Sequence, residues 1–165
     1  MIAAIVLAAG AASRFGAPKQ ALLLPRVLER LAEAPVDEVM VVTGAHPLKA
    51  EGVRVVHAED WELGPGASLR AALGELGPAV EAAVVCLADG PNLAPESVRR
   101  VLGAWRAGAG SVVAASYAGN RGHPLVLGRG AWKSVPDEGM RELPVVLIPC
   151  DDLGAPGDVD TAEDL

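Results

Sequence analysis

The sequence is poor in aromatic residues, in lysine and in net positive charge. Its 165 residues include three Trp, one Tyr and one Phe, and 14 Lys and Arg stand against 21 Asp and Glu, a formal net charge of −7. A core with so few aromatics must be built from Ala, Val and Leu. An acidic chain lacks the basic surface that binds a nucleic-acid backbone, which argues against nucleic acid as a partner. A small anionic ligand is compatible with this composition if a few cations are concentrated at one site.

Long apolar runs and paired cysteines are also missing. No apolar segment reaches the roughly 18 residues of a membrane-spanning helix, and the first apolar segment, Ile2–Ala9, lacks the cationic start of a signal peptide. Cys86 and Cys150 have no CxxC spacing, so they are predicted to be buried thiols in a reducing compartment. With 51% hydrophobic and 21% charged residues, these features predict one folded cytoplasmic domain, residues 1–165, without membrane contact.

Short β-branched runs alternate with helical patterns along the chain. The runs that predict strands are 2–8, 38–43, 53–57, 82–88, 111–117 and 145–148. Apolar residues at helical spacing occur in 27–31 after Pro25, in 69–76, and in 98–105 after Pro95. Near-continuous apolar strands are typical of a sheet that is covered on both faces. The alternation therefore favours a three-layer α/β fold with a mostly parallel sheet.

Two segments depart from this alternation. His123–Leu127 follows the strand Ser111–Tyr117 after five residues, which predicts a small antiparallel insertion of hairpin type. Near the end of the sequence, Thr161 is placed to cap a helix of one or two turns. Because ligands bind beyond the carboxyl ends of strands in open α/β sheets, we expect the site in the loops that follow the parallel strands.

A glycine-containing loop follows the first strand. It reads Leu7-Ala-Ala-Gly10-Ala-Ala-Ser13-Arg14-Phe-Gly16-Ala-Pro-Lys19. Small residues let backbone N–H groups approach an anion, and Arg14 and Lys19 supply positive charge, so the loop suits a triphosphate. Its spacing matches neither G-x-G-x-x-G nor a Walker A loop. The alternative is an ordinary turn between a strand and a helix whose two cations are solvated.

The same loop resembles the signature of the MobA-like nucleotidyltransferases, L-A-[AG]-G-x-S-x-R-[MF]-G-x-x-K-x-L-L, with Ser13 one place later than usual. Its Ala-Ala-Gly form is closest to the molybdenum cofactor cytidylyltransferase (MocA-like) branch. The resemblance implies a Rossmann-like fold and catalytic roles for Arg14 and Lys19. The nucleotide-binding positions that it implies in the loop are Leu7, Ala8, Ala9, Gly10, Ser13, Arg14, Gly16 and Lys19.

A second block, Asp60-Trp61-x-x-Gly64-x-x-x-Ser68-Leu69-Arg70, is similar to the D-W-x-x-G-x-x-x-S-L-R segment of the same branch. It implies a nucleotide contact at Ser68, where a hydroxyl and helix-start N–H groups can meet a base or phosphate. The alternative is an ordinary capped helix. Ala58 stands where the family has Asn, which weakens the case for substrate contacts in this block.

Two acidic blocks resemble the metal-binding segments of the family. Leu87-Ala-Asp89-Gly-Pro is similar to L-x-D-[QM]-P, and Asp158-Val-Asp160-Thr is similar to the tail D-[IV]-D-T. A carboxylate at the end of a buried strand suits a Mg²⁺ ion that bridges nucleotide phosphates. The implied ligands are Asp89, also a catalytic residue, with Asp160 and then Asp158. The alternatives are a turn aspartate at 89 and a negative cap on the last helix.

The fourth block, Gly119-Asn-Arg121-Gly-His123-Pro, is similar to the G-x-x-G-H-P stretch near the acceptor in this family. It implies that Arg121 and His123 bind the acceptor. The alternative is a hairpin tip with an exposed arginine and a histidine held beside proline. The histidines and cysteines lack zinc-ligand spacing, and no G-x-S-x-G serine motif is present.

Taken together, the resemblance implies transfer of CMP from CTP to a phosphorylated acceptor, molybdopterin in this branch, with release of pyrophosphate and with a molybdoenzyme as partner. Other readings stay open: a guanylyltransferase, a sugar- or alcohol-phosphate nucleotidyltransferase, or a non-catalytic regulator that binds nucleotide. Two connections of the family are short here, after Leu24 and after Leu127, so the acceptor pocket is expected to differ in shape.

Overall fold

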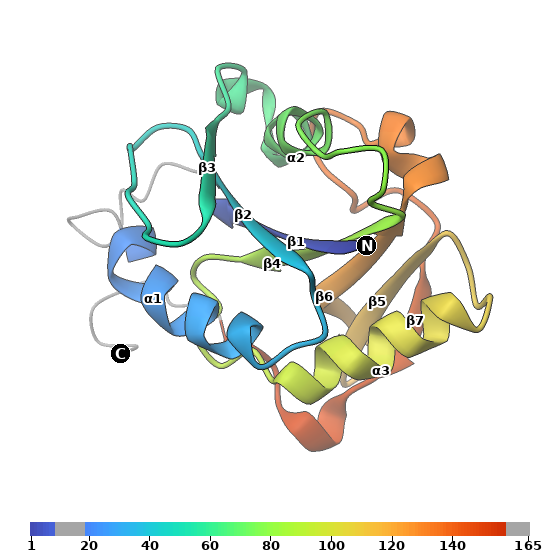
Figure 1. Ribbon diagram of the computed structural model, residues 1–165. Helices are drawn as coiled ribbons and strands as arrows, with labels where there is room; N and C mark the ends of the chain where they lie inside the picture. Colours follow the sequence, from blue (N-terminus) through green and yellow to red (C-terminus); the bar gives the residue numbers. More distant parts are fainter. Residues whose placement is uncertain (9–18, 158–165) are drawn as a thin grey trace.

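The computed structural model describes residues 1–8 and 19–157, and for Lys19 and Gln20 the backbone alone. Seven strands form one sheet in the order β3-β2-β1-β4-β6-β5-β7 (Figure 1). The strands are β1 (Ile2–Ala8), β2 (Glu38–Thr43), β3 (Arg54–His57), β4 (Ala82–Leu87), β5 (Val112–Tyr117), β6 (Asn120–Gly128) and β7 (Val146–Pro149).

One strand of the seven, β6, runs against the others. Its pairings with β4 and β5 are antiparallel, and every other pairing in the sheet is parallel. The carboxyl ends of the six co-directional strands therefore share one edge of the sheet. The amino end of β6 lies at the same edge, which brings Arg121 and His123 to the expected place for a ligand.

Helices cover both faces of the sheet (Figure 1). The apolar faces of α1 (Lys19–Ala32) and α3 (Pro95–Arg106) pack on one side, and those of α2 (Pro65–Leu73) and the 3₁₀ helix η3 (Arg129–Ser134) on the other. Side chains of β1 alternate accordingly, with Val6 in the first core and Ile5 in the second. Two short 3₁₀ turns complete the helices, η2 (Trp61–Leu63) and η4 (Asp151–Leu153). The predicted three-layer α/β fold, mostly parallel with a small antiparallel portion, is confirmed.

The two cores account for the scarcity of aromatic residues. Both are built mainly from Ala, Val and Leu, and Ala3 and Ala4 of β1 are fully buried. Among the described aromatic residues, Trp132 alone is buried.

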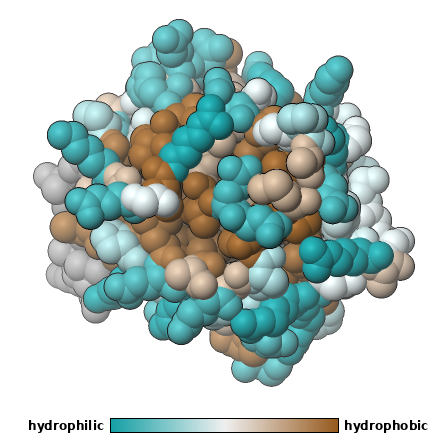
Figure 2. Space-filling view, in the orientation of Figure 1, coloured by the Kyte–Doolittle hydropathy of each residue, from teal (hydrophilic) through white to brown (hydrophobic). Residues whose placement is uncertain are grey.

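On the surface, Figure 2 shows apolar residues gathered at the centre of one face and hydrophilic residues around its rim. Pro65 and Pro95 occupy the first helical positions of α2 and α3. The start at Pro95 was expected, whereas α2 begins before its predicted range, 69–76.

The first helix begins earlier than its pattern predicts. It runs without a break from Lys19 to Ala32, and Pro25 lies inside it instead of before it. Proline removes the hydrogen bond to the carbonyl four residues back, here that of Ala21. Both Ala21 and Pro25 are exposed, so water can satisfy that carbonyl, while Leu24 and Val27 anchor the opposite side of the helix in the core.

The hairpin between β5 and β6 is tighter than expected. Its turn consists of Ala118 and Gly119 alone, with φ values of 52° and 80°, and Tyr117 pairs directly with Asn120. Two successive positive φ angles are typical of the type I′ turn that fits the twist of paired strands. Further along, Ala114 pairs with Leu125 but Ser116 pairs with Arg121. Strand β6 therefore bulges between these two pairings, and the bulge contains His123.

The predictions about the cysteines and about membrane-spanning helices can be compared with the described part of the chain. Cys86 and Cys150 are free and buried, as predicted. No helix within the described residues is long and apolar enough to cross a membrane. The helix predicted at Thr161 lies outside the described residues.

Candidate functional site

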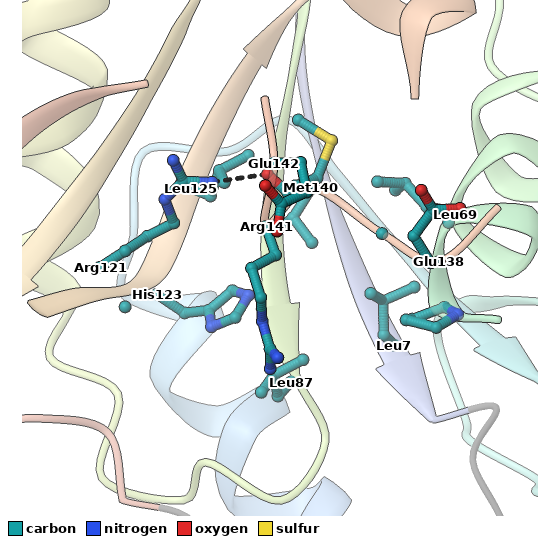
Figure 3. A pocket seen from close by; sticks show the side chains of 15 residues that line it. Leu7, Leu69, Leu87, Arg121, His123, Leu125, Glu138, Met140, Arg141 and Glu142 are labelled. Atoms are coloured by element: carbon teal, nitrogen blue, oxygen red, sulfur yellow. Dashed lines mark hydrogen bonds between the residues drawn. The ribbon is translucent and has the colours of Figure 1, made fainter. Parts of the chain in front are cut away.

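A cavity of about 830 Å³ opens at the carboxyl edge of the sheet (Figure 3). Its floor is aliphatic, with Leu7 from β1, Val85 and Leu87 from β4, and Leu125 from β6. The first turn of α2 forms one wall and the start of β6 forms the other. The remaining lining residues belong to a loop over the cavity: Glu138, Gly139, Met140, Arg141 and Glu142. We call residues 135–143 the strap.

One end of the strap is attached to α2. The backbone N–H groups of Gly66 and Ala67 donate to the Asp137 carbonyl at 2.9 and 3.3 Å, which satisfies donors that a helix start leaves without partners. Arg70 donates to the Val135 carbonyl at 2.5 Å and forms an ion pair with the Asp137 carboxylate. A Cβ on Gly66 would lie 1.6 Å from the Pro136 oxygen, so glycine is required for this close approach.

The other end of the strap is held by Arg121. This side chain donates to the Met140 carbonyl at 2.5 Å and to the Leu143 carbonyl at 2.8 Å. Arg121 lines the cavity, at the place where the sequence motif locates the acceptor. Its guanidinium is engaged with the strap, so two of its donors are occupied by backbone carbonyls.

His123 lies beside Arg121 in the cavity wall. The Tyr117 hydroxyl donates to the His123 carbonyl at 2.8 Å, which ties the bulge of β6 to the end of β5. Burial lowers the pKa of the His123 imidazole to about 4. The ring is therefore neutral at physiological pH and offers one donor and one acceptor of hydrogen bonds, but no positive charge.

Arg141 is a cavity residue that the sequence reasoning missed. In Figure 3 its side chain extends beside His123 toward Leu87. Among the described residues it has no hydrogen bond and no ion pair with the protein. The strap carries no motif of its own, and its position depends on contacts between residues far apart in the sequence. No local signal could have identified Arg141.

Asp89 follows β4 at the same edge. It lies in a turn closed by the N–H of Gly90, which donates to the Leu87 carbonyl at 3.2 Å. A second cavity of about 280 Å³ adjoins this turn and shares Arg121 and His123 with the first. Leu87 lines both cavities and Gly90 lines the second, whereas Asp89, between them in the sequence, lines neither.

The segment that precedes the acidic tail runs beside the Asp89 turn. The Asn92 N–H donates to the Pro156 carbonyl at 2.9 Å. A Cβ on Gly90 would lie 3.1 Å from Pro156 Cβ and 3.4 Å from the Gly157 oxygen. Gly90 thus accommodates the close approach of this segment. The chain then continues to Asp158 and Asp160, which lie outside the described residues.

The predicted nucleotide-binding residues are described only in part. Leu7 lines the cavity and Ala8 is buried at the end of β1. Ser68 is buried on α2, does not line the described cavities, and its hydroxyl has no hydrogen-bond partner among the described residues. The predicted loop positions outside the described residues are Ala9, Gly10, Ser13, Arg14, Gly16 and the side chain of Lys19. The predictions for all these residues stay untested.

A metal site cannot be assembled from the described residues alone. Within residues 1–8 and 19–157, no three His, Cys, Asp or Glu side chains gather closely enough to hold an ion. Asp89 is the one predicted ligand in these ranges. The predicted site adds the tail carboxylates to Asp89, and this prediction stays untested.

Comparison with known proteins identifies the family. Residues 4–143 match the model of the MobA-like NTP transferase domain. The crystal structure of Rv0371c from Mycobacterium tuberculosis H37Rv is similar, with a TM-score of 0.84 and 30% identity over 99% of this chain and 95% of that one. A structure of Rv0371c in complex with manganese gives a TM-score of 0.79 and 28% identity, over 99% and 95% of the two chains.

A nucleotidyl transferase from Methanothermobacter thermautotroptrophicus shares the fold, with a TM-score of 0.74 and 22% identity over 99% of this chain and 94% of that one. A search of the curated proteins found no match. The region matched by the family model runs from β1 through the strap, and so includes the elements that form the larger cavity. The chain belongs to the MobA-like NTP transferase family.

Proposed function

We propose that this protein transfers CMP from CTP to a phosphorylated acceptor of the molybdopterin type, with release of pyrophosphate. The observation that carries the proposal is the meeting of three motif blocks at one edge of the sheet. The end of β1, the Asp89 turn after β4 and the start of β6 lie on neighbouring strands. The cavity between them has room for a substrate of this size.

The nucleotide belongs on the β1 side of this edge. Leu7 and Ala8 lead into the loop of Ala9, Gly10, Ser13, Arg14 and Gly16, which we assign to the triphosphate together with Lys19 at the start of α1. Backbone N–H groups and two cations suit three phosphates. Transfer then needs an acceptor phosphate in line with the α-phosphate, so positioning and charge neutralisation supply the rate, with no covalent nucleophile.

A divalent metal fits the Asp89 turn. Mg²⁺ prefers carboxylate oxygens, and Gly157, the residue before Asp158 in the sequence, lies beside Gly90 of the Asp89 turn. We assign Asp89, Asp160 and Asp158 as the residues that would hold Mg²⁺. When bound, the ion would neutralise charge on the transferred phosphate. The manganese complex of Rv0371c supports a divalent ion in this family.

The acceptor belongs on the β6 side. Here the floor is aliphatic, and His123 is a neutral hydrogen-bonding group. A flat heterocycle suits such a surface better than the body of a sugar phosphate, because its faces can lie on aliphatic side chains while its polar groups stay at the ring edge, whereas a sugar presents hydroxyls on all sides. This observation favours a pterin acceptor. The choice of CTP and a molybdoenzyme partner rest on the family resemblance.

The test is pyrophosphate release with CTP, GTP, ATP and UTP, each combined with molybdopterin and with sugar and alcohol phosphates. We expect turnover with CTP and molybdopterin in the presence of Mg²⁺. Asp89→Ala should abolish it, and Asp152→Ala, which removes a carboxylate paired with Arg100 away from both cavities, should retain it. If Mg·CTP raises the melting temperature and no acceptor turns over, the protein is a nucleotide-binding regulator instead.

A further inference from the structure

The larger cavity contains two arginine side chains that differ in their hydrogen bonds to the protein. Arg121 donates to two strap carbonyls, at 2.5 and 2.8 Å, so the strap fixes its guanidinium and takes up two of its five donors. Arg141 extends beside His123 toward Leu87 without a hydrogen bond or ion pair to any described residue (Figure 3). His123 is neutral. Arg141 is therefore the described cavity residue whose guanidinium is not engaged by the protein and can turn all its donors to a ligand.

The strap fixes where this charge lies. Arg121 binds the carbonyls of Met140 and Leu143, which stand on either side of Arg141 in the sequence. At the other end, the Asp137 carbonyl accepts from the first turn of α2 and Arg70 binds Val135. The backbone that carries Arg141 is thus attached to β6 and to α2. Arg70 and Arg121, which lie in the second and fourth motif blocks, both bind the strap and so shape the site.

The surroundings of Arg141 define the ligand that fits. A guanidinium presents a planar set of donors that binds a phosphate or carboxylate in a bidentate manner. Leu87 and the other aliphatic residues of the floor offer apolar contact next to it. A ligand that uses both features has an anionic group joined to a flat ring, whose face can lie on the aliphatic side chains.

We propose that Arg141 binds the phosphate of the acceptor, and that Arg121 is a positioning residue that holds the strap so that Arg141 reaches it. The inference rests on the proposed function, since it names the residue by which that site recognises its second substrate. It also reassigns Arg121, for which the sequence motif implies direct contact with the acceptor.

The test uses the full chain and two measurements. The first is steady-state transfer with CTP and molybdopterin. Arg141→Gln should raise the KM for the acceptor by about 10- to 100-fold, as expected for loss of a charge-assisted hydrogen bond, with the KM for CTP unchanged. Arg141→Lys should recover part of this loss, because it restores the charge without the bidentate geometry. Arg99→Gln, the same charge change on α3 outside both cavities, should leave both KM values unchanged.

The second measurement is direct binding of 1-naphthyl phosphate, compared with inorganic phosphate, by NMR titration. The aromatic phosphate should bind more tightly than inorganic phosphate to the wild type, and Arg141→Gln should weaken its binding by about 10-fold or more. This readout needs no turnover. Loss of binding in Arg141→Gln supports the inference even if no nucleotide is transferred, in which case the proposed function alone fails.

Arg121 separates the two roles. Arg121→Gln should also raise the acceptor KM, and the double variant with Arg141→Gln should be no worse than Arg141→Gln alone, because both act through one contact. Independent, multiplying losses would show that Arg121 touches the acceptor itself. Normal transfer with an acceptor KM that changes less than twofold in Arg141→Gln would overturn the inference and leave the proposed function intact.

Discussion

The attachment of the strap to α2 can be tested by adding one methyl group at Gly66. The new Cβ would lie 1.6 Å from the Pro136 oxygen and 2.9 Å from the Asp137 oxygen, both backbone atoms that cannot rotate away. The strap must move, and the two hydrogen bonds to the Asp137 carbonyl are lost at about 1 kcal/mol each. Overpacking adds about 1 to 3 kcal/mol, and the better helix propensity of alanine returns up to about 1 kcal/mol. Gly66→Ala should therefore lower the free energy of unfolding by about 3 kcal/mol.

A matched variant makes this result decisive. Gly103 lies in α3, also a helix, and a Cβ there would meet no atom within 4 Å. Gly103→Ala should raise the free energy of unfolding by about 0.5 to 1 kcal/mol through helix propensity alone. Urea denaturation of both variants gives the comparison. If Gly66→Ala stabilises the protein as Gly103→Ala does, the strap does not rest on the first turn of α2.

Three further results are expected. Burial raises the pKa of the Cys86 thiol to about 12 and also raises that of Cys150, so neither should react with a thiol reagent until the protein unfolds; reaction of the native protein would contradict their burial. His123 has a pKa of about 4 when folded against 6.5 ordinarily, so only the unfolded chain binds its proton between these values. Stability, full above pH 6.5, should then fall by about 3 kcal/mol toward pH 4, and His123→Gln should lose this slope; an equal slope in the variant would contradict the assignment. Gly90→Ala would bring a Cβ to 3.1 Å from Pro156 Cβ and should weaken Mg²⁺ binding, measured by calorimetry. Unchanged affinity would show that the tail carboxylates do not bind the metal.

The three layers of the fold could be predicted from the local sequence pattern because most strands are almost continuous apolar runs. Such runs are typical of strands that are covered on both faces, and Pro95 marked the start of α3. Two of the differences between the predicted and the observed fold concern backbone conformations that the residue types do not indicate. Pro25 is tolerated within α1 on an exposed side, and Ala118 adopts a positive φ that is typical of Asn or Gly.

Part of the site could also be predicted. The motifs predicted roles for Asp89, Arg121 and His123, and the structure brings these residues to one edge of the sheet because parallel strands end there and β6 starts there. The roles themselves stay predictions. The strap was not predictable, because Arg70 and Val135 are 65 residues apart and nothing in either segment indicates their contact. Arg141 owes its position to that contact, so its importance becomes visible only in three dimensions.

The reversal of β6 has a consequence for how such proteins diversify. The residues that we assign to the triphosphate occupy the beginning of the chain, whereas the start of β6 and the strap form a continuous stretch from Asn120 to Leu143. Strand β6 starts at the shared edge because it is reversed, and the strap returns to that edge after η3. In the proposed function, the two substrates therefore contact separate portions of the chain. Substitutions in the later portion can change the acceptor while the nucleotide is still held by the earlier one.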